Sequence, residues 1–219
     1  MAIRITAVFF DFIGTTVLEK NNDVVLSCFQ QSFDDFGIRV DRQTIQEHRG
    51  KRKDIMIADI LKLSQKDPRK YPHIFDAFKE HLTRRINDLY ENKDLDQTMA
   101  HFRSRKVKVG LGSGLPREIV QMLLEHFHWE RFGFDYISTS EEIGKSRPHP
   151  EMIIDMMVKL HLNNFQFLKV GDTVADIQEG RNANVMTAAL LSGTQPESVL
   201  RKENPDYVLK ALGDLRQIV

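Results

Sequence analysis

The chain has 219 residues, and its 31 Lys and Arg balance its 31 Asp and Glu, so the formal net charge is zero. A neutral chain lacks the global positive field that attracts nucleic acid or an anionic membrane surface, and this one has no run of about 20 apolar residues that could span a bilayer. Its single cysteine, Cys28, excludes an intramolecular disulfide and fits a reducing compartment, so we expect a cytoplasmic protein with one domain of ordinary size and a small insert.

The first predicted element is a short buried strand that ends at a carboxylate. Residues 7–11 read Ala-Val-Phe-Phe-Asp, and Gly14, Thr15 and Thr16 follow shortly afterwards. An apolar run of this length indicates a buried strand. Open α/β sheets bind their ligands outside the carboxyl ends of their strands, so we expect Asp11 to face a cleft.

The sequence pattern becomes helical after this strand. Apolar residues recur at spacings of three and four up to about residue 95, and no strand pattern interrupts them, which predicts an all-helical insert. Linkers near residues 16–21 and 91–96 join the insert to the rest of the chain, and a phenylalanine stripe is expected to form its core. The stripe consists of Phe29, Phe33 and Phe36, and the predicted helices cover residues 23–36, 42–49, 54–63 and 71–90.

Strand and helix patterns alternate from about residue 95 onward. This alternation favours a parallel sheet with right-handed crossovers and helices on both faces, an α/β Rossmann-like fold. We therefore expect a core domain (residues 1–16 and 96–219) and a helical insert domain (17–95). Predicted helices cover 95–103, 117–128, 150–162 and 174–182, and predicted strands cover 106–113, 135–140, 165–172, 185–192 and 207–209.

Three further segments place polar or charged residues at strand ends or helix starts. One strand ends at Ser113 and Gly114, a cation precedes a Pro-x-Pro helix start at residues 144–150, and another strand ends in Gly-Asp at Asp172, with Asp176 one helical turn later. The carboxyl ends of parallel strands lie along one edge of the sheet, so these residues should meet at the crevice that Asp11 faces.

These segments resemble, in order, the four motifs of the haloacid dehalogenase superfamily, and the match covers essentially the whole chain. The resemblance implies a Mg²⁺-dependent phosphohydrolase in which Asp11 attacks phosphorus and forms an aspartyl-phosphate that water then hydrolyses. It implies metal ligands at Asp11, the backbone carbonyl of Ile13 and Asp172, with Asp176 orienting a metal-bound water or the neighbouring cation. The helical insert resembles the small α-helical cap of this superfamily.

The same resemblance implies how the phosphoryl group is held. Ser113 and the backbone N–H of Gly114 would bind non-bridging oxygens, and Thr15 is a further candidate. Arg147 would supply positive charge to the transition state and could hold Asp11 or the phosphoryl group bidentately. Lys145 is the alternative cation, and Arg147 is favoured because it directly precedes the proline.

One position departs from the superfamily pattern, because Ile13 stands where a second aspartate protonates the leaving group. The phosphonoacetaldehyde hydrolase branch has a small apolar residue there, since a C–P bond offers no leaving oxygen, and a cap lysine forms a Schiff base instead. That lysine lies in a Gly-x-x-Lys step, which residues 50–53 match. The resemblance implies Lys53 as this residue, with a pKa lowered by burial and nearby cations. Two positions differ from the branch: Leu115 replaces a tyrosine and Met56 a histidine.

Three functions are compatible with these residues. The favoured one is a Mg²⁺-dependent phosphonatase-like hydrolase of a small phosphorylated or phosphonate metabolite, working through an aspartyl-phosphate on Asp11. The second is a slow phosphomonoesterase that lacks its general acid, and the third is a catalytically weak protein that binds a phosphate ligand. The expected partner is the small-molecule substrate, without nucleic acid or membrane, and the expected state is a monomer or a homodimer.

Overall fold

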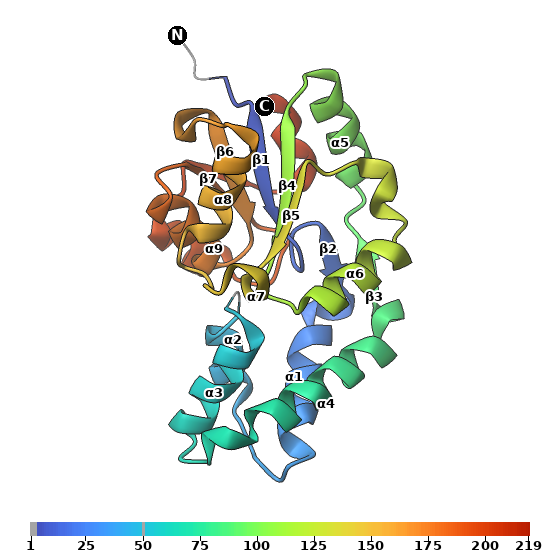
Figure 1. The fold of residues 1–219 in the computed structure, drawn as a ribbon, viewed down its shortest axis with the longest axis vertical. Helices are drawn as coiled ribbons and strands as arrows, with labels where there is room; N and C mark the ends of the chain where they lie inside the picture. The colour runs from blue at the N-terminus through green and yellow to red at the C-terminus, as the bar shows by residue number, and fades with distance from the viewer. Residues whose placement is uncertain (1–3, 50) are drawn as a thin grey trace.

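The computed structural model describes residues 4–49 and 51–219, and its centre is a six-stranded parallel sheet (Figure 1). The strand order is β5-β4-β1-β6-β7-β8. The order changes direction between β1 and β6, which is where an open α/β sheet forms a crevice. The strands are β1 (Ala7–Asp11), β4 (Lys108–Ser113), β5 (Tyr136–Thr139), β6 (Phe167–Gly171), β7 (Met186–Leu190) and β8 (Tyr207–Leu209).

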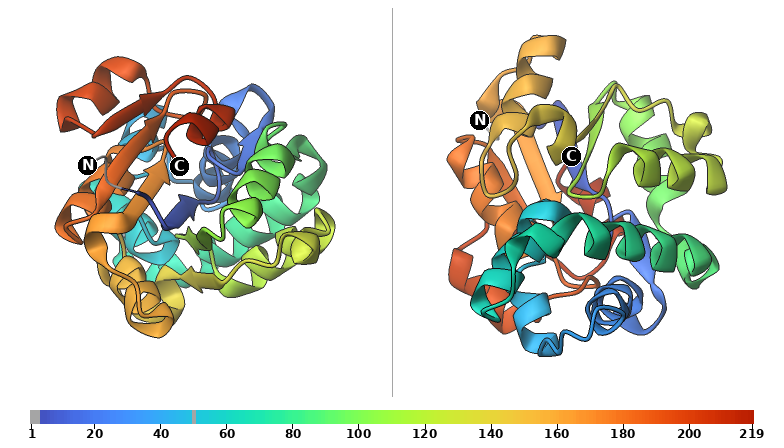
Figure 2. Two further views of the ribbon diagram at one scale, coloured as in Figure 1. Left: turned by 90° about the horizontal axis from the view of Figure 1, so that it is seen from above. Right: turned by 60° about the horizontal axis from the view of Figure 1, so that its bottom comes forward.

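Helices cover both faces of this sheet, as Figure 2 shows. Successive residues of β1 point to opposite faces: Phe10 stacks on Phe102 with ring centroids 6.2 Å apart, whereas Phe9 packs against Tyr136 on the other side, at 6.1 Å. The expected α/β fold is confirmed. The helices of the core are α5 (Leu95–Ser104), α6 (Arg117–His126), α7 (Ser140–Ile143), α8 (Glu151–Leu160), α9 (Val174–Asn182) and α10 (Glu197–Leu200).

The helical insert forms a separate layer beyond the carboxyl edge of the sheet (Figure 1). Its core includes Phe29 and Phe78, which stack with ring centroids 3.9 Å apart, and Phe33, which is fully buried. The expectation for Phe36 was wrong: it is 37% exposed, because α1 ends before it and the chain turns away. The helices are α1 (Val24–Asp34), α2 (Arg42–Glu47), α3 (Lys53–Leu63) and α4 (Tyr71–Arg84).

The linkers contain strands that the sequence pattern did not predict. β2 (Val17–Glu19) and β3 (Leu89–Glu91) form an antiparallel ribbon, so the helix expected over residues 71–90 ends at Arg84. Strands of three residues are too short to show alternation, and here they are stabilised by pairing with each other. The buried Asn92 also ties the linkers together, since its backbone N–H donates to the carbonyl of Thr16 over 2.9 Å. The division of the chain into two domains at residues 16 and 95 stays a prediction.

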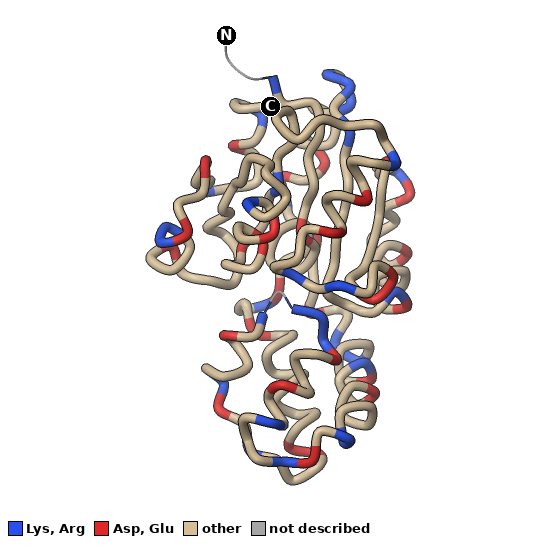
Figure 3. Tube along the Cα trace, turned by 60° about the vertical axis from the view of Figure 1, so that its left-hand side comes forward, with Lys and Arg blue, Asp and Glu red and all other residues tan. Residues whose placement is uncertain are grey.

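Charge is distributed evenly over this architecture. Figure 3 shows Lys and Arg interspersed with Asp and Glu over both the core and the cap. Within residues 4–49 and 51–219, none of the helices has the length and hydropathy needed to cross a membrane.

The stacked pair in the cap gives a test of its packing. We expect Phe78→Ala to lower the free energy of unfolding by about 3–5 kcal/mol, because it leaves a cavity against Phe29. The control Phe36→Ala should cost less than about 1 kcal/mol, since that ring is partly exposed. Urea unfolding followed by circular dichroism measures both, and equal losses would contradict this description of the cap core.

Candidate active site

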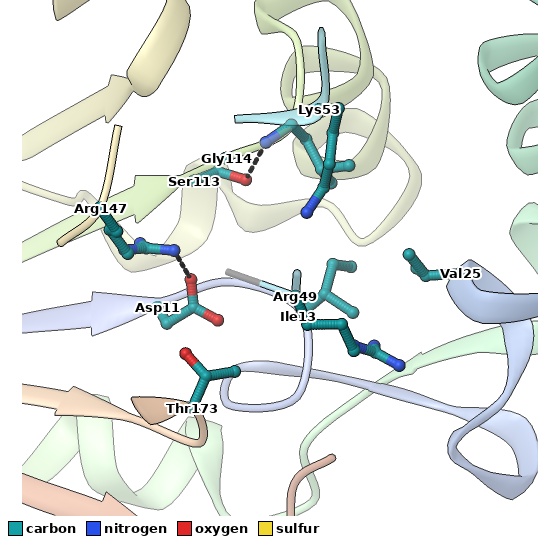
Figure 4. A pocket seen from close by; sticks show the side chains of 10 residues that line it. Asp11, Ile13, Val25, Arg49, Lys53, Ser113, Gly114, Arg147 and Thr173 are labelled. Carbon is teal, nitrogen blue, oxygen red and sulfur yellow. Dashed lines mark hydrogen bonds and ion pairs between the residues drawn. The ribbon is translucent and has the colours of Figure 1, made fainter. Parts of the chain in front are cut away.

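Asp11 ends β1 at the carboxyl edge of the sheet and pairs with a cation. Its Oδ1 lies 2.6 Å from Nη1 of Arg147 (Figure 4). Asp11 is 6% exposed and Arg147 is 2% exposed, so solvent screens the pair weakly. Burial raises the pKa of Asp11, and Arg147 acts in the opposite direction. The ionised carboxylate that a nucleophile requires therefore depends on its neighbouring cations.

The guanidinium of Arg147 is fixed on several sides. It donates from Nε to Glu179 over 3.0 Å and from Nη2 to the carbonyl of Gly112 over 2.8 Å. Burial opposes its charged form, but the adjacent carboxylates hold the pKa of Arg147 above its usual value. Lys145, the alternative cation of the third motif, is exposed. The structure thus brings Arg147 to Asp11 and leaves Lys145 at the surface.

Asp11 also belongs to a group of three buried carboxylates. Asp11, Asp172 and Asp176 each offer an oxygen, and these atoms lie within 4.8 Å of one another. Asp172 accepts hydrogen bonds from the backbone N–H and hydroxyl of Thr194, over 2.8 and 2.6 Å. Burial, followed by the repulsion of Asp11 and Asp176, raises the pKa of Asp172 to about 7. Oxygen ligands crowded in this way fit a hard divalent cation.

Gly14 allows the loop after β1 to approach these carboxylates. Its φ is +97°, a conformation that residues with side chains rarely adopt, and a Cβ there would lie 2.2 Å from Oδ2 of Asp172. The glycine of the first motif therefore keeps space beside the carboxylate. Ile13, whose backbone carbonyl is the expected third ligand, precedes it and lines the pocket (Figure 4).

Asp176 has a different environment from Asp172. Its Oδ1 lies 3.0 Å from Nζ of Lys169 and 3.2 Å from Nε of Arg147, and its Oδ2 accepts a hydrogen bond from the Thr173 hydroxyl at the start of α9. Although burial opposes ionisation, Lys169 and Arg147 hold the pKa of Asp176 below its ordinary value. The position of Asp176 therefore favours a role in orienting the neighbouring cation, Arg147.

Lys169 and Glu179 belong to this cluster but carried no motif signal. Lys169 is 1% exposed in β6, and its Nζ lies 3.0 Å from both Asp176 and Glu179. A lysine inside an apolar strand is the one signal that could have pointed to it, since a buried lysine needs carboxylate partners. Among the described residues, this cluster holds four carboxylates (Asp11, Asp172, Asp176 and Glu179) but only two directly paired cations (Arg147 and Lys169). A divalent cation would offset that excess.

The expected phosphate-binding residues differ in position, because Ser113 and Gly114 line the pocket whereas Thr15 does not. Ser113 ends β4, is 2% exposed and accepts a hydrogen bond from the backbone N–H of Leu115 over 3.0 Å, and both Ser113 and Gly114 line the pocket. Thr15 is fully buried, and its hydroxyl donates to Asp172 over 3.1 Å. Thr15 therefore orients a carboxylate from behind the pocket, which favours that role over contact with phosphate.

The cap contributes cations to the same pocket. Lys53, the first residue of α3, is 8% exposed, and its amine points into the pocket (Figure 4). Burial, followed by the charge of Arg49, lowers the pKa of Lys53 to about 8. Arg49, which the sequence analysis missed, also lines the pocket. Gly50 of the Gly-x-x-Lys step lies outside the described residues.

The pKa of Asp172 predicts how stability depends on pH. Because burial raises this pKa from 3.8 to about 7, the folded protein retains a proton in this window that the unfolded chain has released. The free energy of unfolding of the metal-free protein should therefore fall as the pH rises from about 4 to about 7. Relative to Asp172→Asn, which cannot ionise, the parent should lose on the order of 3 kcal/mol between about pH 4 and about pH 8.

Urea unfolding in chelator measures this difference. Asp96→Asn is a matched control, because the Asp96 side chain is 65% exposed and should leave the pH dependence of the parent unchanged. If the parent and Asp172→Asn show parallel pH dependences, the buried Asp172 does not carry the effect.

Comparison with known proteins finds similar hydrolases and a solved structure with the same fold. The chain is 27% identical over 220 residues to pyrophosphatase PpaX of Oceanobacillus iheyensis, covering 100% of this chain and 98% of the relative. It is 23% identical over 237 residues to phosphonoacetaldehyde hydrolase of Bacillus cytotoxicus, covering 99% and 87%. A crystal structure of a phosphonoacetaldehyde hydrolase-like protein from Oleispira antarctica has the same fold, with a TM-score of 0.87 at 18% identity, covering 98% of this chain and 91% of that one.

Residues 8–190 match the sequence profile of the haloacid dehalogenase-like hydrolases. The match includes the strand end of Asp11, the helical cap, and the cluster of Arg147, Asp172 and Asp176. The protein is therefore a member of the haloacid dehalogenase-like hydrolase family.

Proposed function

We propose that this hydrolase releases phosphate from a small phosphorylated or phosphonate metabolite through an aspartyl-phosphate on Asp11, with Mg²⁺ as cofactor. The observation that carries the proposal is the contact between Asp11 and Arg147, 2.6 Å apart and beside the carboxylate cluster. A carboxylate can attack an anionic phosphoryl group only where cations neutralise the charge between them. The relatives named as pyrophosphatase and phosphonoacetaldehyde hydrolase support a phosphoryl or phosphonate substrate.

The chain's own residues supply most of the steps. A carboxylate oxygen of Asp11 attacks phosphorus, the bond to the leaving group breaks, and water then hydrolyses the aspartyl-phosphate. Arg147 stabilises the charge that develops on the phosphoryl oxygens, and the Ser113 hydroxyl and Gly114 N–H bind them. Mg²⁺, held by Asp11, Asp172 and the carbonyl of Ile13, would act as a Lewis acid on those oxygens.

Lys53 favours the phosphonate form of this reaction as a second candidate. A lysine with a pKa of about 8 is partly neutral near neutral pH, as attack on a carbonyl requires. Its amine lines the same pocket as Asp11, and Ile13 provides no acid for an oxygen leaving group. An iminium on Lys53 would accept the electron pair of the departing carbon when the C–P bond breaks.

The nucleophile is tested by Asp11→Asn. Because an amide is a poor nucleophile and a weak metal ligand, we expect phosphate release to fall by on the order of 10³-fold or more, and chelation of Mg²⁺ to abolish it in the parent. The measurement is phosphate release from a metabolite panel that includes phosphonoacetaldehyde and acyl phosphates, with circular dichroism as the control for folding. Retained turnover in Asp11→Asn would sink the covalent mechanism.

Ile13 and Lys53 separate the two leaving-group chemistries. If Lys53 forms an iminium, borohydride with phosphonoacetaldehyde should trap an adduct on that residue, and Lys53→Ala should lose C–P cleavage, while Lys51→Ala from the same basic run keeps it. The opposite outcome, no adduct together with a gain of about 10²–10⁴-fold in monoester hydrolysis on Ile13→Asp, would identify a phosphatase that lacks its general acid.

A further inference from the structure

Arg49 has one nitrogen that nothing in the described part of the chain satisfies. Its side chain is 7% exposed and lies in the loop between α2 and α3. Nη2 pairs with the carboxylate of Glu19, whereas buried Nη1 has no hydrogen-bond partner among the described residues. Buried polar atoms without partners are rare in folded proteins, and one on a charged group in a pocket indicates a place for a ligand.

The position of this guanidinium relates it to the reaction. Arg49 lines the same pocket as Asp11, Ser113 and Arg147, on the cap side, while those three line it on the core side (Figure 4). A phosphoryl group at Asp11 would leave its leaving group facing the cap. Arg49 therefore lines the side of the pocket that a leaving group would face.

Glu19 fixes the direction of Arg49. The Glu19 side chain is fully buried, and its second oxygen accepts a hydrogen bond from the backbone N–H of Val25 over 2.7 Å. Glu19 belongs to β2 of the linker ribbon and Val25 to α1 of the cap, so both elements hold the carboxylate. A guanidinium has five donors in a fixed fork, and pairing with Glu19 leaves others for a second anion.

A neighbouring charge adds to the positive potential of this region. Arg49 and Lys53 line one pocket, and after burial the charge of Arg49 contributes most to lowering the pKa of Lys53. Two cations confined in this way repel each other, and an anion bound between them would relieve that repulsion.

We infer that the cap side of the pocket is a subsite for a second oxyanion, in which Arg49 binds a carboxylate or phosphoryl group carried by the leaving group. The inference rests on the proposed hydrolytic function and deepens it. The substrate class is then a small phosphate or phosphonate with a second negative group. Phosphonoacetaldehyde, whose leaving group is uncharged, would leave Nη1 unpaired, so the inference favours the first candidate function over the Lys53 chemistry.

The test compares three probes that differ in the second group: phosphoglycolate carries a carboxylate, pyrophosphate carries a phosphoryl group, and methyl phosphate carries neither. The variant is Arg49→Met with Glu19→Gln, which avoids leaving a buried carboxylate unpaired, and its reference is Glu19→Gln alone. Arg52→Met is a matched control on the same loop, because Arg52 already donates to Asp54 over 2.7 and 2.8 Å.

We expect KM for at least one charged probe, relative to KM for methyl phosphate, to rise by about 10–100-fold in the double variant, the factor for a lost charge-assisted hydrogen bond. Lysine in place of methionine at position 49 (Arg49→Lys) should reverse part of this rise in the KM ratio. Arg52→Met should leave the KM ratio unchanged. The charged probe whose KM ratio rises identifies the second oxyanion as a carboxylate or a phosphoryl group. The same ratios are taken from dissociation constants measured by calorimetry with Mg²⁺ present.

The outcomes separate this inference from the proposed function. Ratios that stay within about twofold in both charged arms would overturn the subsite and leave hydrolysis standing. A shifted ratio of dissociation constants, with no phosphate release from these probes or from the metabolite panel, would support the subsite and overturn the hydrolytic function.

Discussion

A carboxylate buried at the end of a parallel strand stays ionised only where cations lie in contact with it. Here Arg147 contacts Asp11 and is itself held by Glu179 and by the carbonyl of Gly112. Lys169 joins the same cluster from β6 and contacts Asp176 and Glu179. The positions of these cations account for the rest of the site: Arg147 and Lys169 oppose the rise that burial causes in the pKa of Asp11, and the carboxylates outnumber the cations, which suits a divalent ion.

The cap adds a second set of charges to those of the core. Its helices join the core through the β2–β3 ribbon, and Glu19 of that ribbon holds Arg49 over the pocket. The core side of the pocket is lined by Asp11, Ser113 and Arg147, which would act on phosphorus in the proposed reaction, whereas the cap side is lined by Lys53 and Arg49, which would face the leaving group. With this division, a change in the cap would alter the leaving-group side of the pocket and leave Asp11 and its partners untouched.

Sequence patterns predicted the parallel sheet and the helical insert because both give long periodic signals. They also placed Asp11, Asp172 and Arg147 near one another, since strand ends of a parallel sheet share an edge. The ribbon of β2 and β3 was missed because its strands have only three residues each. Lys169 and Arg49 were missed for other reasons. The lysine inside an apolar strand signals a buried charge, but it belongs to none of the four motifs, and Arg49 pairs with Glu19, 30 residues earlier in the chain, which no local pattern encodes.

The most direct test of the central claim, that Asp11 is an ionised nucleophile made competent by its cations, is fluorine NMR with beryllofluoride, which mimics a phosphoryl group on a carboxylate. The account predicts resonances of protein-bound fluoride that require Mg²⁺ and are absent in Asp11→Asn. The same bound resonances in Asp11→Asn, or in the parent protein in excess chelator, would contradict it.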